Sequence, residues 1–454
     1  MELENRLVEY AVDTKFSDIP QKPVNVVKEI ILGIFGSIAA GAYSGECVSL
    51  AQLLKEMGGK PEATILIHGG KLPGHCVAIA NATMAQSLDY DDAVVPGVHI
   101  GCVSVPAALA AAEIAGGCSG RDFLTALTVG IEFANRLNTI NFASFYGGFH
   151  GTGVCAVFGA SIAASRILGL NAEQMRDAIG LALNWAGGSG QNNVEGVHAV
   201  SIVAGIASQG GIFSAQLAQR GVTGPRQFLE GAKGWASMFG TSKVNPELVT
   251  GELGTRYELN KTLFKKFPSC GLTQTSTQGI LEIMKENQVT AADIDKIEVR
   301  VGPFASTVVG HFEIGRNPTM NAQFSIPYCV SNALTRGSSE LTHFEEAMVR
   351  DQKIAGLAAL VHVITDPAVE KRDQRAMEMD VRTKSGQSYH KRIDVPRGSP
   401  GNEMTREEQI ARFRQCAVFG KKPLPEKNIA SIISMVDAIE NMADVRDLIP
   451  LMIP

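Results

Sequence analysis

The sequence predicts a mainly α-helical fold, with a large all-helical domain and a smaller α+β domain. Apolar segments rich in Gly, Ala and Ser recur through the first part of the chain, and small side chains let helices pack closely. Segments with the apolar–polar alternation of strands appear only after about residue 262. We therefore expect a helical domain over residues 1–262, an α+β domain over 263–399, and a return of residues 400–454 to the helical domain.

The helical domain contains four segments whose composition is typical of tightly packed helices. These segments are residues 24–44, 105–116, 153–169 and 200–221. A further apolar-periodic segment begins near Asn81 and ends before Pro96-Gly97, a pair that breaks helices. The glycine pairs of this domain do not sit between a strand and a helix, so no phosphate-binding loop is expected.

The α+β domain is expected to alternate helices with strands. A helix over 274–288 precedes a strand over 294–302, and residues 357–367 run from a helix end into a strand or turn. Residues 376–396 read as a hairpin that turns at Lys384-Ser385-Gly386. Helix returns over 405–445, where Thr405 and Glu408 have the spacing of a capping box.

Composition narrows the class of protein. The 41 basic and 46 acidic side chains give a net charge of −5, and no Lys/Arg-rich block suggests nucleic-acid binding. The 8 cysteines are scattered without a CxxC pair, as reduced thiols are in a cytoplasmic protein. The start of the chain is acidic, unlike a signal peptide, and no uninterrupted apolar run reaches the roughly 20 residues of a membrane helix. A soluble cytoplasmic protein is therefore predicted.

The stretch from Asn81 to Cys102 is the first candidate for a site. It places Asp89, Asp91 and Asp92 before a turn and His99 after it, between two apolar helices. Acidic groups and a histidine on a short loop between buried helices are typical of functional loops. The alternative is that the aspartates solvate a helix end and the histidine is structural.

Successive blocks of the sequence resemble the MmgE/PrpD family, in that family's order and over nearly the whole chain. Among them are ANATMAQSLDYDD, VHIGCVSVPAALA, GFHGTGV, FKKFPSCGLT, FSIPYCVSNAL and VPRGSPGNEMT. The resemblance implies a large helical domain, a smaller α+β lid domain, a homodimer, and a site in the cleft between the domains. Asp91 and Asp92 hint weakly at a metal, but without a second cluster of His or Glu they are interpreted as helix-end anchors, so no metal or cofactor is expected. It does not fix the reaction, because the family includes 2-methylcitrate dehydratase, cis-aconitate decarboxylase and iminodisuccinate epimerase.

The resemblance also assigns candidate site residues. By their motifs, the positions that match catalytic residues of the family are Asp89, His99, His150, Lys265 and Tyr328. Imidazole suits proton transfer near neutral pH, while Lys265 and Tyr328 would bind substrate carboxylates. A shift by one to Lys266 stays open, as does a purely structural role for Tyr328.

Several positions depart from the members that act on tricarboxylates. Ala93 stands where a threonine is usual, and Gln274, kept as a candidate for substrate binding, stands where a histidine is found. Val200 and Val203 occupy positions of a lysine and a histidine. His198 could supply a replacement for substrate binding, and Gln191-Asn192-Asn193 could offer neutral donors, although ordinary loop solvation is the favoured interpretation of both. A tricarboxylate should bind poorly in such a pocket.

The leading functional hypothesis is a metal-free lyase that acts at a carbon next to a carboxylate, most like a dehydratase on a hydroxylated di- or tricarboxylate. One alternative is an isomerase or epimerase that only moves a proton at such a carbon. Others are a decarboxylase of the cis-aconitate type and a binding protein without catalysis. The sequence does not identify the small carboxylic acid that would be the substrate.

Overall fold

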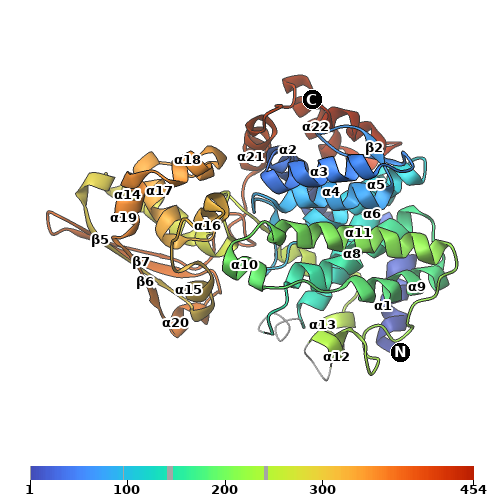
Figure 1. The fold of residues 1–454 in the computed structure, drawn as a ribbon. Helices are drawn as coiled ribbons and strands as arrows, with labels where there is room; N and C mark the ends of the chain where they lie inside the picture. The colour runs from blue at the N-terminus through green and yellow to red at the C-terminus, as the bar shows by residue number, and fades with distance from the viewer. Residues whose placement is uncertain (1, 96, 141–146, 240–243) are drawn as a thin grey trace.

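A computed structural model of the chain describes residues 2–95, 97–140, 147–239 and 244–454. A large helical domain stands beside a smaller domain that contains a four-stranded sheet, as Figure 1 shows. The predicted fold class, mainly α with a small α+β domain, is confirmed. Pro96, part of the predicted helix-breaking turn, lies outside the described residues.

The helices of the large domain include all four segments predicted from composition, with ends that differ by a few residues. Their bounds are α1 Glu2–Asp13, α2 Gln21–Gly41, α3 Gly45–Met57, α4 Gly74–Gln86, α5 Gly101–Ile114, α6 Gly120–Asn138, α8 Gly151–Ile167, α9 Ala172–Ala182, α10 Gln191–Glu195, α11 Ala199–Gln219, α12 Trp235–Phe239 and α13 Pro246–Thr250. Two-stranded ladders join β1 Ala63–Thr64 to β2 Lys71–Leu72, and β3 Asp92–Ala93 to β4 Leu263–Phe264.

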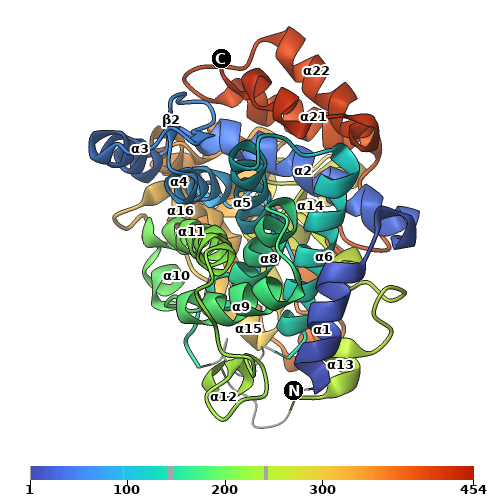
Figure 2. The same cartoon turned by 90° about the vertical axis from the view of Figure 1, so that its right-hand side faces the viewer.

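Helix α8 lies at the centre of this domain, packed against α5, α6, α9 and α11 (Figure 2). Small residues make the close approach possible. A side chain at Gly130 of α6 would collide with the backbone of Gly159 in α8, and one at Gly211 of α11 would collide with Ala160. The Gly- and Ala-rich composition of these segments therefore reflects helix packing around α8.

The smaller domain is built on a sheet with the strand order β6-β5-β7-β8. Strand β5 pairs in parallel with β6 and antiparallel with β7, which forms a hairpin with β8. The strands are β5 Ile294–Val301, β6 Val361–Thr365, β7 Met377–Thr383 and β8 Ser388–Ile393, and the helices are α14 Gln274–Asn287, α15 Pro303–Val309, α16 Pro318–Gln323, α17 Ile326–Arg336, α18 Glu346–Val349, α19 Gln352–Ala358 and α20 Pro367–Glu370. The predicted helix, strands and hairpin of this region are all confirmed.

The last part of the chain returns to the large domain. Helix α21 (Arg406–Phe419) packs against α2, as does α22 (Glu426–Asp437), and Thr405 and Glu408 form the predicted capping box. One hydrophobic core joins residues from 3–264 with residues from 404–452, while a second runs from 270 to 393. The domain boundaries at 262/263 and 399/400 stay a prediction that agrees with this division.

Helices α2 and α11 have the length and composition of membrane spans, with 21 residues each and mean hydropathies of 1.5 and 1.3. Neither is an uninterrupted apolar run, since α2 contains Lys28 and Glu29 and α11 contains Ser208 and Gln209. Of their most apolar windows, 72% and 67% are buried inside the fold. Core helices of a soluble protein show such burial. A soluble, cytoplasmic protein stays a prediction.

Candidate active site

A two-residue ladder places the acidic loop beside Lys265. Asp92 pairs with Phe264, and Ala93 pairs with Leu263. The residue after this ladder is Lys265, which therefore lies next to the loop of Asp89 and Asp91 although the sequence separates them by 176 positions. Residues far apart in the sequence thus meet at one point.

Lys265 is fully buried, and its charge is matched by the loop. Its Nζ lies 2.8 Å from Asp89 Oδ1 and 4.0 Å from Asp91 Oδ1, and it donates to the Asp89 carbonyl at 2.6 Å. Burial alone would lower the pKa of the ammonium, but the two carboxylates raise it above its ordinary value. Lys265 is therefore a fixed positive charge beneath the site.

Tyr90 and Arg412 hold the acidic loop from behind. The Tyr90 hydroxyl donates to the Lys266 carbonyl at 2.9 Å. The guanidinium of Arg412, on α21, lies 4.3 Å from the centre of the Tyr90 ring and donates to the Tyr90 carbonyl. The returning C-terminal helix thus helps to position Asp89 and Asp91.

His99 faces the acidic loop. Its Nδ1 lies 3.0 Å from Asp91 Oδ2, and its Nε2 lies 3.8 Å from Asp89 Oδ1. Burial lowers the pKa of His99, but the charge and hydrogen bond of Asp91 outweigh burial and raise it above the ordinary value. The same partnership lowers the pKa of Asp91 despite its burial. His99 is therefore a proton donor whose charge a carboxylate stabilises.

His150 stands at the start of α8, held by the neighbouring segment. Its backbone N–H donates to the Gly188 carbonyl at 2.9 Å, and the hydroxyl of Thr152, in the first turn of α8, accepts from the His99 backbone at 3.0 Å. His150 is buried, and its Nδ1 has no hydrogen-bond partner among the described residues. Burial and the charge of His99 lower the pKa of His150 to about 4. At neutral pH it is therefore an uncharged base.

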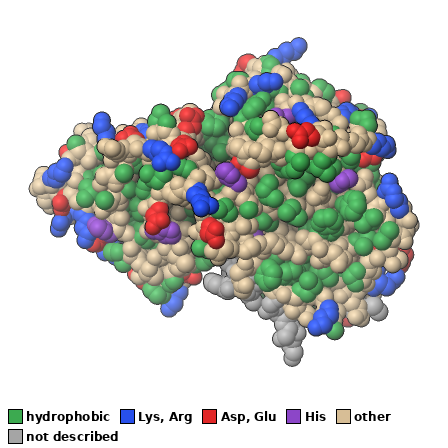
Figure 3. All heavy atoms as spheres, viewed as in Figure 1, with side chains coloured by type: hydrophobic (Ala, Val, Ile, Leu, Met, Phe, Trp, Pro, Cys, Tyr) green, Lys and Arg blue, Asp and Glu red, His purple; other side chains and the backbone are tan. Residues whose placement is uncertain are grey.

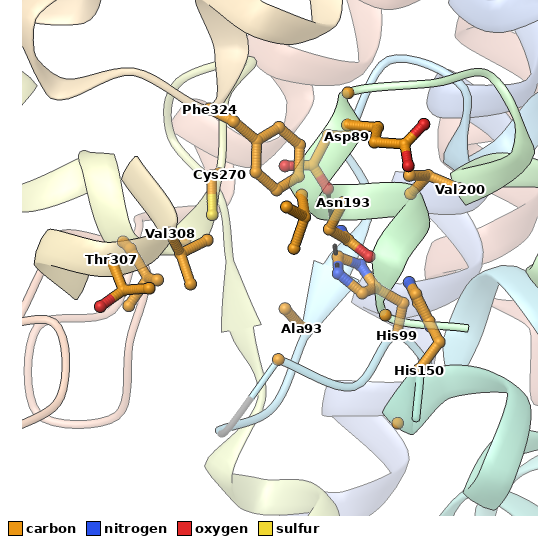
Figure 4. Close-up of a pocket in the computed structure, with 18 of the residues that line it drawn as sticks. Asp89, Ala93, His99, His150, Asn193, Val200, Cys270, Thr307, Val308 and Phe324 are labelled. Atoms are coloured by element: carbon orange, nitrogen blue, oxygen red, sulfur yellow. Dashed lines mark ion pairs between the residues drawn. The ribbon is translucent and has the colours of Figure 1, made fainter. Parts of the chain in front are cut away.

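The two histidines line one cavity of about 920 Å³ between the domains. In Figure 4, His99 and His150 lie on one side of this space, with Asp89, Asn193 and Val200 above them and Thr307 and Val308 on the opposite side. Gln86, on the last turn of α4, also lines the cavity, and neither atom of its buried amide is paired within the described structure. Unpaired buried polar atoms of this kind call for a ligand or water.

Two family descriptions together match most of the chain. Residues 5–247 match the MmgE/PrpD N-terminal domain, and residues 267–438 match the MmgE/PrpD C-terminal domain. The chain belongs to the MmgE/PrpD family.

Individual members of the family are distant relatives. Cis-aconitate decarboxylase of Homo sapiens is 26% identical over 389 residues, which span 82% of this chain and 78% of that protein. Cis-aconitate decarboxylase of Aspergillus terreus is 22% identical over 476 residues, which span 99% and 95% of the two chains. A cis-aconitate decarboxylase-like protein of Aspergillus oryzae is 26% identical over 268 residues, or 56% of this chain and 55% of that protein.

Three residues that the family resemblance assigns, Asp89, His99 and His150, line the cavity, and Lys265 lies directly behind Asp89. Lys266 instead points outward to Glu408 at 3.1 Å with 40% of its side chain exposed. The choice between the two lysines therefore favours Lys265 as the one that meets the acidic loop.

Tyr328 and Gln274 are not among the cavity-lining residues, unlike the prediction from their motifs. Tyr328 is buried between Phe312 and Phe344, and its hydroxyl donates to the His343 carbonyl. The Gln274 amide is used by the segment after Lys265: its oxygen accepts from the N–H groups of residues 266 and 267, and its nitrogen donates to the carbonyls of 267 and 269. The polar groups of both side chains therefore form hydrogen bonds within the protein.

His198 does not reach the cavity either. Its side chain is 55% exposed, and its Nε2 lies 3.8 Å from Glu46. Val200 lines the cavity, whereas Val203 packs behind it against Gly153 and Gly188. Val200 thus presents an apolar side chain to the cavity, and the His198 side chain does not reach the same space.

The structure adds cavity residues that the sequence did not single out. Besides Gln86, Arg316 lines the mouth in the loop after α15, and its guanidinium has no ion-pair or hydrogen-bond partner among the described residues. A glutamine at the end of an otherwise apolar helix was a signal for Gln86, but nothing in the sequence marked Arg316. Gln191 and Asn193, considered as neutral donors, both line the cavity.

Asp89, Asp91 and His99 also form a group with metal-binding geometry, since their ligand atoms lie within 4.8 Å of one another. The Lys265 ammonium already lies against Asp89 and near Asp91 in this corner. A divalent cation would face that fixed positive charge at close range, so the donor set does not suit one. That the protein uses no metal stays a prediction.

Proposed function

We propose that this protein is a lyase that breaks a bond at a carbon next to a carboxylate by proton transfer between histidines and substrate. The observation that carries the proposal is the pair of buried histidines on one cavity whose pKa values are shifted in opposite directions. Two groups whose environments separate their pKa values in this way are suited to act as acid and base. The names of the relatives, which are decarboxylases, support the lyase class.

Dehydration of a hydroxylated acid uses both histidines. Neutral His150 takes the proton from the carbon next to the carboxylate, and the electron pair forms the carbon–carbon double bond. Protonated His99 gives its proton to the departing hydroxyl, which leaves as water. Asp91 stabilises His99 in the charged state before this transfer, at 3.0 Å, and the buried Lys265 balances the two aspartates.

Decarboxylation is the second candidate, favoured by the names of the relatives. Here the bond to a carboxylate breaks, carbon dioxide leaves, and its electron pair stays on the substrate carbon conjugated to a second acid group. His99 then supplies the proton that this carbon needs. His150 has no required proton transfer in this reaction and would only shape the cavity.

We propose that Arg316 and Gln86 bind the substrate carboxylates, in addition to or in place of Lys265 and Tyr328. Lys265 is committed to the aspartates, and the second cavity-lining arginine, Arg375, is paired with both oxygens of Asp373 at 2.9 and 3.0 Å. Arg316 at the mouth and the unpaired amide of Gln86 remain as donors for substrate oxygens. Substrate binding by Tyr328 stays a prediction, although its hydroxyl donates to the His343 carbonyl.

Reaction in deuterated water separates the candidates. A panel of hydroxylated and unsaturated di- and tricarboxylates is incubated with the protein, and products are followed by NMR and by carbon dioxide release. Loss of water from a hydroxy acid supports dehydration, and carbon dioxide release with one deuterium incorporated supports decarboxylation. Deuterium incorporation with inversion of configuration would instead reveal an epimerase. Absence of exchange with every acid would contradict catalysis at such a carbon.

A homodimer is also proposed, as the family resemblance implies. Figure 3 shows hydrophobic side chains gathered over the helical domain on the face of α3 and α11. Leu53 and Met57 of α3 are 53% and 70% exposed, and Ile206 of α11 is 42% exposed. Both helices pack against α4. Exposed apolar side chains on one face of the molecule suit a protein interface, here with a second copy of the chain.

A further inference from the structure

The cavity is larger than a small acid needs. Its volume of about 920 Å³ falls near the upper end of the roughly 300–1,000 Å³ found for sites that enclose drug-sized ligands. A hydroxylated acid of four to six carbons, with its carboxylate near His99, fills only part of this space. What occupies the rest depends on the chemistry of the opposite wall.

That wall is apolar and comes from both domains. Ala93 and Leu263, on the β3–β4 ladder, are buried with only 7% and 2% exposure. Val308 of α15 faces Ala93 across the cavity (Figure 4), and Phe324, which follows α16, lines another side. Leu272 completes the apolar surface beside Cys270. These side chains belong to elements whose other faces pack into the hydrophobic cores, so packing holds the wall in position.

The residues named for this wall carry no charge. Arg375 also lines the cavity, but Asp373 pairs with its guanidinium and Ser399 accepts a hydrogen bond from it at 3.0 Å. Cys270 is a thiol whose pKa burial raises to about 12, so it stays neutral. A carboxylate or hydroxyl placed against Ala93, Leu263 and Val308 would lose its water without gaining a partner.

We propose that the substrate is a carboxylic acid with an apolar substituent, an alkyl chain or an aromatic ring, that packs between the β3–β4 ladder and α15. The proposal rests on the proposed function for the position of the acid group and adds the class of substrate. The substituent would extend from the histidines toward Val308, on the side opposite Val200 (Figure 4). Burial of the apolar substituent against this wall removes both surfaces from water and so favours binding. This contribution would take the place of the ion pairs that Val200 and Val203 cannot form with a carboxylate.

Binding without turnover tests the proposal. Dissociation constants of the full-length protein are measured by calorimetry for succinate and for 2-methyl-, 2-butyl- and 2-phenylsuccinate. All four acids carry the same two carboxylates and therefore the same net charge. Each methylene that becomes buried should tighten binding roughly three- to fourfold, so 2-butylsuccinate should bind at least tenfold more tightly than succinate. Equal affinity for succinate and its substituted forms would overturn the proposal while leaving the proposed function intact. If no acid of any kind binds, the proposed function fails and this inference fails with it.

Variants locate the substituent. Val308→Asn places a polar amide on the wall and should remove most of the preference for the substituted acids, with little change for succinate. Val308→Phe fills the space and should weaken only the substituted acids, which covers the case in which the asparagine variant does not fold. Val418→Asn, at an exposed valine of α21, is the matched control and should leave every affinity unchanged. A preference that survives both Val308 variants would contradict the proposed location.

Discussion

The two domains face the same cavity with different chemistry. The helical domain contributes ionisable groups whose charge states are set by buried neighbours, with Asp91 against His99 and His150 in an apolar helix start. The α+β domain contributes Val308, Phe324 and Leu272, together with Arg316 at the mouth. The comparison suggests that the helical domain determines which bond reacts and that the α+β domain determines which acid is accepted.

The largest effect is expected from the histidines of the helical domain. Replacing His99 or His150 by Ala should lower kcat by two or more orders of magnitude while the fold is kept, because a positioned proton-transfer group contributes about 10²–10⁴-fold. Steady-state kinetics on the true substrate, with circular dichroism for the fold, provide the measurement. His198→Ala is the control, since His198 is half exposed and outside the cavity. Near-normal turnover by the His99 or His150 variant would contradict that residue's role.

A second prediction tests the buried contact between Lys265 and the carboxylates of Asp89 and Asp91. Lys265→Met leaves Asp89 and Asp91 buried without their cation, and breaking a buried pair of this kind typically costs about 3–5 kcal/mol. Lys266→Met should cost less than about 1 kcal/mol, because the Lys266–Glu408 pair is partly exposed. Denaturant unfolding of the two variants checks the difference. Equal free energies of unfolding for the two variants would mean that the buried ion pair does not stabilise the fold.

The pH dependence of turnover reports on the electrostatics of the helical domain. His150 must be neutral, so activity should fall as the pH drops through its pKa of about 4. His99 must be protonated, and its raised pKa places the loss of activity on the alkaline side above about 6.5. Asp91→Asn removes the carboxylate that raises the pKa of His99, so this alkaline limb should move to lower pH. The charge of Asp91 also raises the pKa of His150, so the acid limb should move to lower pH as well. A kcat/KM profile measured between about pH 3 and 9 tests both limbs.

A smaller effect is expected from a double variant that tests whether the helical domain also contributes to substrate specificity. Val200 lies on α11 and lines the cavity, with Val203 packed behind it. The double change Val200→Lys and Val203→His should raise the kcat/KM ratio of a tricarboxylate over a dicarboxylate several-fold, because a new cation pairs with the third carboxylate. Packing strain of about 1–3 kcal/mol at the buried Val203 offsets part of this gain. Efficient turnover of 2-methylcitrate by the unmodified protein would show that Val200 does not exclude tricarboxylates.

No effect is expected from metal removal. Incubation with a chelator should change neither activity nor melting temperature, because Lys265 already neutralises the acidic corner. The same samples are assayed again after addition of zinc, magnesium or iron(II). Activity that is lost with the chelator and regained with one of these ions would replace the histidine mechanism with a metal-assisted one.

Local features of the fold could be predicted from the sequence because their signals are local. The hairpin at Lys384–Gly386 and the capping box of Thr405 and Glu408 depend on residues a few positions apart. The β3–β4 ladder could not be predicted in this way, since two residues per strand leave no alternation to detect and the partners are distant in sequence.

The site was predictable to the extent that motifs identify residues, but motifs do not show where a side chain points. His99 and His150 lie together on the cavity as expected, whereas the hydroxyl of Tyr328 is turned to the His343 carbonyl. Gln274 shows the same limit, because its amide satisfies a turn that exists only once the chain is folded. Arg316 was missed because an arginine in a loop has no distinguishing pattern.

The ladder between residues 92 and 264 also has a consequence for synthesis of the protein. A ribosome produces the acidic loop 176 residues before the lysine that neutralises it, which takes about 10–35 s at roughly 5–20 residues per second. During that time Asp89 and Asp91 would have to stay hydrated or protonated, so the helical domain cannot close over them. We therefore expect the acidic corner to assemble only after residue 265 has been made and to gain its last support when α21 brings Arg412 to Tyr90. A nascent chain stalled before residue 265 should keep its loop open to proteolysis.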